Sequence, residues 1–511
     1  MNSYRLITAL ALISIIRTAP AQDIETFLHQ YIDAVINEDF TAAGNFWLEA
    51  DLQRSQRLGI VYTGDPLKID SASPIFNARR QLKSGLYSWQ IKQIGRLDNF
   101  FRVAITVKGI NESSDFLYCI KSDSAGLELT SPFSIPDNQW AQLSAKYIEL
   151  HYQDERLFNF QALVAADSFI QQLGKFFAIS DERMRLLARE KIDYYLASAD
   201  MVEQLTGFDA QGLANLQFDA VISRHLPHYH ELTHLMLNFA LHELPLYTLP
   251  LFQEGAAAGF GGRWGKSPQV ILQLGELYLR DGWLQPESAF AWRDFHALGA
   301  DMAYPLAALW TRFLQDKLGG EKFRNLYLSF SADAEKVMAM DEAGVKQILC
   351  DYSRLDWQTL KTAFLDYSKS FKYNGIIPLQ CMPRNIIPYF SFEKNSSVIK
   401  IYYYDDDYYC EIELGSAKKL GVFVNPQNKS SVYQSWMFAE QFPKEIYTGE
   451  EMGIVFLPGE AGIYDYNCNI LTAKLTQVFQ GREGFEEEGI IRCKITKSIW
   501  REGEMKTIIV E

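Results

Sequence analysis

The sequence predicts an α+β protein of two or three domains. Its 511 residues exceed the size of one ordinary domain. A hydrophobic content of 48% and an aromatic content of 14% suffice for sizeable cores. Helical periodicity and strand-like alternation dominate different parts of the chain. We therefore expect a targeting segment at 1–21, an α+β domain at 22–145, a mostly helical domain with a small sheet at 146–375, and a β-rich domain at 376–511.

The first 21 residues have the organisation of a signal peptide. Arg5 supplies a positive charge, Leu6–Ile16 form a short apolar stretch, and Ala19–Ala21 form a small-x-small cleavage site. The apolar stretch is too short to span a bilayer, and no later stretch reaches the length of a transmembrane helix. We expect a soluble mature chain that is exported to the periplasm or the extracellular space, with no integral membrane segment.

The segment 22–145 combines one helix with several strands. Apolar residues recur at helical spacing in residues 23–40, whereas residues 87–91 and 101–107 alternate like strands. The sequence CIKSDSAGLELT predicts a hairpin with its turn in Ser122–Gly126. A helix followed by a curved meander resembles the NTF2-like fold, and an unrelated small α+β domain fits the pattern equally well.

The next two segments differ in their dominant period. Residues 160–177 and 304–320 have helical periodicity, and KIDYYLA and FDAVIS are short strand candidates between helices. From about residue 376 the chain becomes β-rich, beginning with a strand, an acidic turn and a strand at 398–414. Short strands separated by Gly, Asn and Pro are typical of a β-sandwich, which we expect at 376–511.

Five of the eight histidines in the chain fall between residues 225 and 242. Within this cluster His230 and His234 are four residues apart, which places both imidazoles on one face of a helix. Two neutral imidazoles at this spacing can chelate one Zn²⁺ ion. Glu231 lies about 100° further around the helix, where it is badly placed as a ligand but can reach a metal-bound water. The alternative is a polar helix with two incidental histidines.

A catalytic zinc needs a third protein ligand and one open position. Glu254 lies twenty residues after His234, in the sequence LFQEGAAAGFGG. The small residues that follow it would let a second helix pack closely against the first and direct the carboxylate to the metal. We expect one catalytic Zn²⁺ bound by His230, His234 and Glu254.

HELTH at 230–234 and QEGAA at 253–257 resemble the zinc helix and the third-ligand motif of the gluzincin metallopeptidases, which include thermolysin-like enzymes, the M1 aminopeptidases and the broader peptidase MA-like group. The resemblance covers roughly residues 150–350. It implies a zincin-type catalytic domain in which His230, His234 and Glu254 bind zinc.

The resemblance also implies that Glu231 is the general base of peptide hydrolysis, and it has limits. Thermolysin-like enzymes carry acidic residues at the positions of Asn238 and Ala258, and the aminopeptidase GAMEN motif is missing before the zinc helix. These departures favour the looser MA-like group over a thermolysin relative or an aminopeptidase.

Two further elements have expected roles around the metal. Tyr304 precedes a helical stretch, with Pro305 at the expected helix start, and is our candidate donor to the developing oxyanion. The alternative for Tyr304 is a buried tyrosine that packs the helix. His296 is a second candidate for the donor. FDAVIS at 218–223 precedes the zinc helix, where the family has an edge strand that binds extended substrate. An ordinary core strand is the alternative.

Composition limits the class of partner. The formal net charge of −14 argues against nucleic acid and against anionic membranes. The expected function is an exported zinc metallopeptidase that acts on peptides or proteins. The alternative is a catalytically inactive, zinc-binding interaction or adhesion protein on the same fold.

Overall fold

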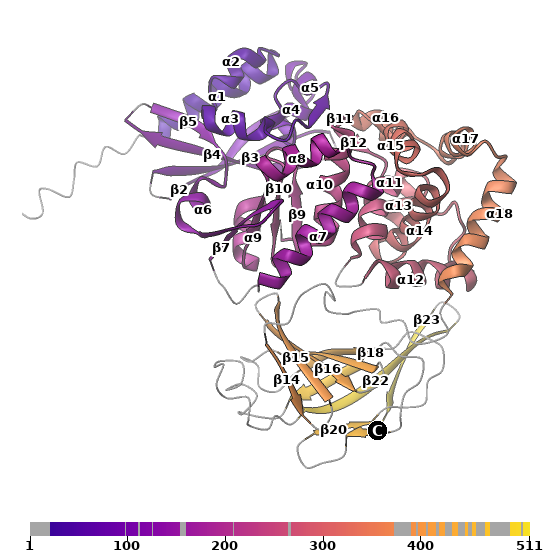
Figure 1. Cartoon of the computed structure of the whole chain (residues 1–511). Helices are drawn as coiled ribbons and strands as arrows, with labels where there is room; N and C mark the ends of the chain where they lie inside the picture. The colour runs from indigo at the N-terminus through magenta and orange to yellow at the C-terminus, as the bar shows by residue number, and fades with distance from the viewer. Residues whose placement is uncertain are drawn as a thin grey trace, which may run out of the picture. The chain divides into compact units, whose positions relative to one another are not determined.

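The computed structural model describes residues 21–97, 99–110, 113–124, 126–153, 160–207, 209–263 and 267–372, and individual strands between residues 390 and 510. It is a mixed helix and sheet structure, as the sequence predicted (Figure 1). The chain divides into two compact units, the first formed by Met1–Gln56 and Pro66–Asn138 and the second by Arg57–Asp65 and Gln139–Glu511. The expected signal peptide lies outside the described residues, apart from Ala21 at the start of the first helix.

The first unit combines short helices with one antiparallel sheet. The sheet has the order β2-β3-β4-β5, and the turn between its last two strands falls where the sequence predicted it. The elements are α1 (Ala21–Ile36), α2 (Phe40–Gly44), α3 (Glu49–Gln56), η1 (Lys68–Asp70), α4 (Pro74–Asn77), α5 (Arg79–Lys83), β2 (Ser88–Leu97), β3 (Phe100–Lys108), β4 (Ser113–Asp123), β5 (Gly126–Thr130) and α6 (Ser134–Gln139).

A buried polar cluster lies in the core of the first unit. Tyr118 donates a hydrogen bond from its hydroxyl to Asp70 Oδ2 (3.1 Å), and Ser73 Oγ lies 2.7 Å from the same hydroxyl. Trp47 Nε1 donates to the hydroxyl of Tyr31 (3.1 Å). Burial raises the pKa of Asp70 to about 8, although hydrogen bonds from Tyr31, Tyr118 and Ser73 act in the opposite direction. Asp70 is therefore mostly protonated at neutral pH in the folded protein.

The second unit contains a five-stranded mixed sheet with the order β6-β7-β8-β10-β9. Its strands are β6 (Ala141–Ser144), β7 (Ile148–Tyr152), β8 (Ile192–Leu196), β9 (Gly212–Asn215) and β10 (Ala220–Ser223). β7, β8 and β10 are parallel, and β9 pairs antiparallel with β10. The strand at 218–223 is therefore not an edge strand: β10 is fully buried between two neighbours, and β9 forms the edge.

The helices of the second unit form the larger part of its core. They are α7 (Phe160–Phe176), α8 (Asp181–Glu190), α9 (Ala199–Thr206), α10 (Tyr229–Leu241), α11 (Pro250–Ala256), η3 (Ala257–Gly261), α12 (Pro268–Arg280), α13 (Trp292–Ala297), α14 (Ala300–Leu318), α15 (Gly320–Ser329), α16 (Ala334–Ala339), α17 (Glu342–Ser353), α18 (Trp357–Ser368) and η4 (Lys369–Phe371). α14 is central and packs against α11 and α12. On it, fully buried Trp310 stacks on Phe364 with ring centroids 3.8 Å apart and donates to the Pro286 carbonyl (2.7 Å).

Two short strand pairs also belong to the second unit. β1 (Val61–Thr63) pairs in parallel with β11 (Glu243–Pro245), which is why a segment that precedes much of the first unit belongs to the second. β12 (Tyr247–Thr248) pairs with β13 (Ser331–Ala332). Among the described residues, no helix is both long and apolar enough to cross a membrane.

The C-terminal part is β-rich, as expected. β15 and β16 form the hairpin predicted at 398–414. The strands are β14 (Phe390–Lys394), β15 (Ser397–Tyr404), β16 (Asp407–Leu414), β17 (Lys418–Val424), β18 (Val432–Met437), β19 (Glu445–Tyr447), β20 (Met452–Val455), β21 (Tyr466–Ile470), β22 (Ile491–Arg501) and β23 (Glu504–Val510). Whether these strands form a sandwich stays a prediction.

Candidate metal centre

The histidine cluster lies on and just before α10. The helix begins at Tyr229, directly after His228, and ends at Leu241, where His242 takes a left-handed backbone conformation with φ of 52°. Nine of its thirteen residues are buried, because the sheet and the helices of the second unit surround it. The four-residue spacing of His230 and His234 puts both rings on one side of this rigid helix, as the sequence predicted.

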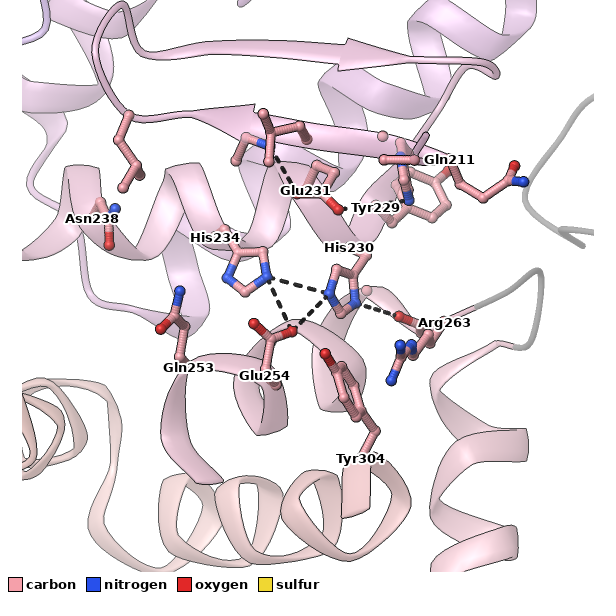
Figure 2. Close-up of a pocket in the computed structure, with 18 of the residues that line it drawn as sticks. Gln211, Tyr229, His230, Glu231, His234, Asn238, Gln253, Glu254, Arg263 and Tyr304 are labelled. Carbon is pink, nitrogen blue, oxygen red and sulfur yellow. Dashed lines mark hydrogen bonds and ion pairs between the residues drawn. The ribbon is translucent and has the colours of Figure 1, made fainter. Parts of the chain in front are cut away.

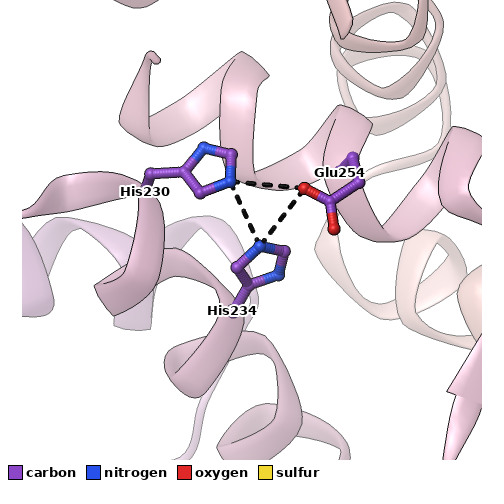
Figure 3. A group of neighbouring side chains, drawn as sticks. All are labelled: His230, His234 and Glu254. Carbon is purple, nitrogen blue, oxygen red and sulfur yellow. Dashed lines mark hydrogen bonds and ion pairs between the residues drawn. The ribbon is translucent and has the colours of Figure 1, made fainter. Parts of the chain in front are cut away.

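The structure brings His230, His234 and Glu254 together (Figure 3). The two Nε2 atoms lie 3.2 Å apart, and Glu254 Oε2 lies 3.4 Å from the first and 3.6 Å from the second. Ligands about 2.0–2.1 Å from one tetrahedral zinc ion lie roughly 3.3 Å from each other. The three ligand atoms therefore already have the spacing that a single zinc ion requires.

The backbone of the chain orients the first histidine. His230 Nδ1–H donates a hydrogen bond to the Gly262 carbonyl oxygen (2.9 Å), which leaves Nε2 as the atom that faces the cluster. A carbonyl partner of this kind fixes the tautomer and the ring plane of a metal-binding histidine. Gly262 can take this position because its φ of 80° suits glycine and because Gly261 before it lets η3 approach α10 closely.

Glu254 reaches the histidines from α11. This helix begins with Pro250 at its first position and continues as the π-helical turn η3, an irregularity that is frequent at functional sites. The small residue after Glu254 packs α11 against α14 rather than against α10, since a Cβ on Gly255 would lie 2.6 Å from the Ala307 carbonyl oxygen. Burial alone would raise the pKa of Glu254, but the neighbouring histidines hold it well below its ordinary value.

Glu231 lies beside the ligand cluster and is held by the edge strand (Figure 2). The Ala214 N–H of β9 donates to Glu231 Oε2 (2.8 Å), and Glu231 Oε1 lies 4.0 Å from His228 Nε2. Burial lowers the pKa of His228 well below its ordinary value, so His228 is a neutral neighbour. The side chain of Glu231 is 13% exposed, which leaves it accessible from the cavity.

Tyr304 also lies at the site, but not at the helix position expected. α14 begins at Ala300, so Pro305 lies inside the helix and Tyr304 lies in its second turn rather than at its N-terminus. The Tyr304 ring nevertheless lines the cavity, with its centroid 6.2 Å from that of His230. Burial, followed by the Glu254 carboxylate, raises the pKa of Tyr304, which keeps the phenol protonated. His296, a weaker candidate for the same role, lies on the exposed face of α13.

These groups line one cavity of about 530 Å³. The cavity extends from His230, His234 and Glu254 along β9 and past Arg263. Sequence reasoning missed three of its features: the Ala214 N–H, the Gly262 carbonyl and Arg263. The first two are backbone groups, which carry no signal in side-chain patterns. The Gly-Gly-Arg sequence at 261–263, where η3 ends, was the available signal for the third.

At the two positions where thermolysin-like enzymes carry acidic residues, the side chains of this protein fit their surroundings. Asn238 donates to the Tyr62 hydroxyl (3.2 Å), and Ala258 is fully buried in η3. Comparison with known proteins adds no family: the chain matches no family model, and no curated protein is significantly similar to it.

Proposed function

We propose that this chain is an exported zinc-dependent metallopeptidase of the gluzincin type, in which His230, His234 and Glu254 bind one zinc ion. The observation that carries the proposal is the convergence of these three ligand atoms at 3.2–3.6 Å. The cluster includes one carboxylate, so a bound zinc ion would keep a net charge of about +1 and an open position for water or substrate.

Bound zinc would supply Lewis acidity and lower the pKa of a water molecule toward 7. The role of Glu231 follows from its position beside the cluster, with Oε2 fixed by Ala214. Its carboxylate accepts a proton from the attacking water as the new C–O bond forms at the peptide carbonyl. It then delivers this proton to the amine nitrogen as the C–N bond breaks. The Tyr304 hydroxyl donates to the carbonyl oxygen on which negative charge develops.

The finer features of the fold belong to the same proposal. We infer a zincin-type catalytic domain within the second unit, an NTF2-like first domain and a C-terminal β-sandwich. The functional assignment does not depend on the two flanking domains, because every residue assigned here to the metal or to catalysis lies between positions 230 and 304.

The test compares zinc content and peptide hydrolysis in the parent chain, Glu231→Gln and Glu243→Gln. Glu243 follows His242 as Glu231 follows His230, but it is exposed on β11, so it is a matched control. We expect one zinc per chain in all three proteins. We also expect chelator-sensitive hydrolysis in the parent and the control, with a loss of at least about 100-fold in Glu231→Gln.

Two outcomes would contradict the proposal. Zinc binding without hydrolysis of any peptide by the parent would favour the inactive, zinc-binding interaction protein. Absence of zinc from the parent, even after loading with excess metal, would mean that the histidine and glutamate cluster serves packing alone.

A further inference from the structure

The cavity wall carries one permanently positive side chain beside the candidate metal ligands. Arg263 is the single lysine or arginine among the described residues of the lining, which also contains Glu231, Glu254 and Asp209. Asp209 is exposed and forms an ion pair with Arg224. The two glutamates together offset a divalent cation, so Arg263 remains a positively charged group at the cavity wall, and the Asp301 carboxylate of α14 acts on it from outside the lining.

Arg263 is held in a fixed place close to the metal ligands. Its guanidinium carbon lies 3.2 Å from the centroid of the Tyr304 ring, and that ring is stacked toward His230 at an interplanar angle of 28°. Nη1 of Arg263 reaches the Ala300 carbonyl oxygen at 3.5 Å. Figure 2 shows the guanidinium group beside Tyr304, on the side of the cavity next to His230. Stacking on an aromatic face orients the planar guanidinium group and reduces the freedom it loses on binding.

We propose that Arg263 binds a substrate carboxylate that lies one or two residues from the scissile bond. A planar guanidinium group fits a carboxylate through two parallel hydrogen bonds. The guanidinium carbon and the His230 ring lie 3.2 Å and 6.2 Å from the same Tyr304 centroid, and an extended chain advances about 3.3–3.6 Å per residue, so a side chain one or two residues from the metal can reach Arg263. This inference rests on the proposed peptidase function, and it narrows the substrate class to peptides with a carboxylate at that position.

The carboxylate has two chemical sources, which matched peptides distinguish. One pair of peptides differs only in a free or an amidated C-terminus near the cleavage site. A second pair has an amidated C-terminus and differs in Glu or Gln next to the scissile bond. We expect the parent enzyme to prefer one carboxylate-bearing peptide over its neutral partner by about 10- to 100-fold in kcat/KM, the range for a hydrogen bond to a charged group.

The variant Arg263→Gln should bring the ratio of kcat/KM between the carboxylate peptide and its neutral partner close to one. Arg263→Lys should retain part of this preference, because lysine keeps the positive charge but lacks the planar guanidinium group. Arg293→Gln is the control, because Arg293 is exposed on α13 and should leave the ratio at the parent value. Equal rates for both members of each pair in the parent, or an unchanged ratio in Arg263→Gln, would overturn the inference. Circular dichroism and thermal unfolding show whether each variant is folded.

A binding experiment tests the Arg263 subsite independently of the proposed peptidase function. Zinc-loaded Glu231→Gln is titrated with the same peptides by calorimetry, with and without Arg263→Gln. Tighter binding of the carboxylate peptide that disappears with Arg263→Gln supports the subsite even if no peptide is cleaved. Equal affinity for acid and amide peptides in Glu231→Gln refutes the subsite, whereas hydrolysis and zinc content alone decide the peptidase.

Discussion

Replacement of Gly261 by alanine tests how the backbone supports the metal site. A Cβ on Gly261 would lie 2.5 Å from the Tyr229 carbonyl carbon and 2.6 Å from the His230 amide nitrogen, whereas ordinary contacts begin at 3.4 Å. Both neighbours are backbone atoms, so no change of side-chain rotamer relieves the overlap. η3 and α10 must therefore separate by about 1 Å.

This separation acts directly on His230, one of the three proposed zinc ligands. The hydrogen bond from His230 to the Gly262 carbonyl is 2.9 Å long, and a shift of that size carries it beyond the usual range. Loss of such an orienting partner weakens zinc binding about 10- to 100-fold. Overpacking of the contact costs about 1–3 kcal/mol of folding free energy. We expect Gly261→Ala to show both effects.

Zinc affinity is measured by competition with a chromogenic chelator, and stability by thermal unfolding of the metal-free protein. Gly44→Ala is the control, since no atom lies within 4 Å of the added Cβ. Parent-like zinc affinity in Gly261→Ala, together with reduced stability, would refute the orienting role of the Gly262 carbonyl. Parent-like values of both quantities would refute the packing argument itself.

Three further predictions concern the site and the two cores. Tyr304→Phe should keep one zinc per chain but lower kcat about 10²–10³-fold, measured by steady-state hydrolysis. Asp70 has a folded-state pKa of about 8, above its unfolded value near 4, so its stabilising contribution is complete below pH 4 and is lost as the pH rises through 8. Urea unfolding between pH 5 and 9 should therefore show a loss of up to roughly 1.4 kcal/mol per pH unit up to pH 8, and Asp70→Asn should flatten that dependence. Trp310→Ala removes the stack on Phe364 and should destabilise the second unit by about 3–5 kcal/mol, seen as a lower unfolding midpoint; a loss below 1 kcal/mol would contradict its central place in the core.

Local pattern predicted the parts of the site that depend on local geometry. His230 and His234 share a helix face because four residues make about one turn, and no tertiary information is needed for that inference. Glu254 was identified through its sequence context, and the structure places it with the histidines. Its supporting contacts differ from expectation, because Gly255 faces α14 while Gly261 approaches α10.

Features that depend on contacts between distant parts of the chain could not be predicted from the local sequence pattern. β10 is a buried central strand and β9 is the edge, yet both are short, and only their pairing partners decide which is outermost. Pro305 suggested a helix start, but the surrounding packing tolerates it inside α14, where tertiary context overrides the local preference. Arg263 became a candidate for substrate binding only through its contact with the Tyr304 ring, and these two residues are about forty positions apart in the sequence.

The first unit is formed by two separate stretches of the chain, and this limits how proteolysis could remove it. Arg57–Asp65 lies between two parts of the first unit but carries β1 and the buried Tyr62 of the second. A single cut near residue 139 would separate this segment from the covalent chain that carries α10, and the hydrogen bond from Asn238 to Tyr62 would then be one of the contacts that hold the segment in place. Removal of the first unit as a propeptide, with Arg57–Asp65 left in place, would therefore need a cut on each side of this segment and a third cut near residue 139. In every case β1 would stay attached only by non-covalent contacts.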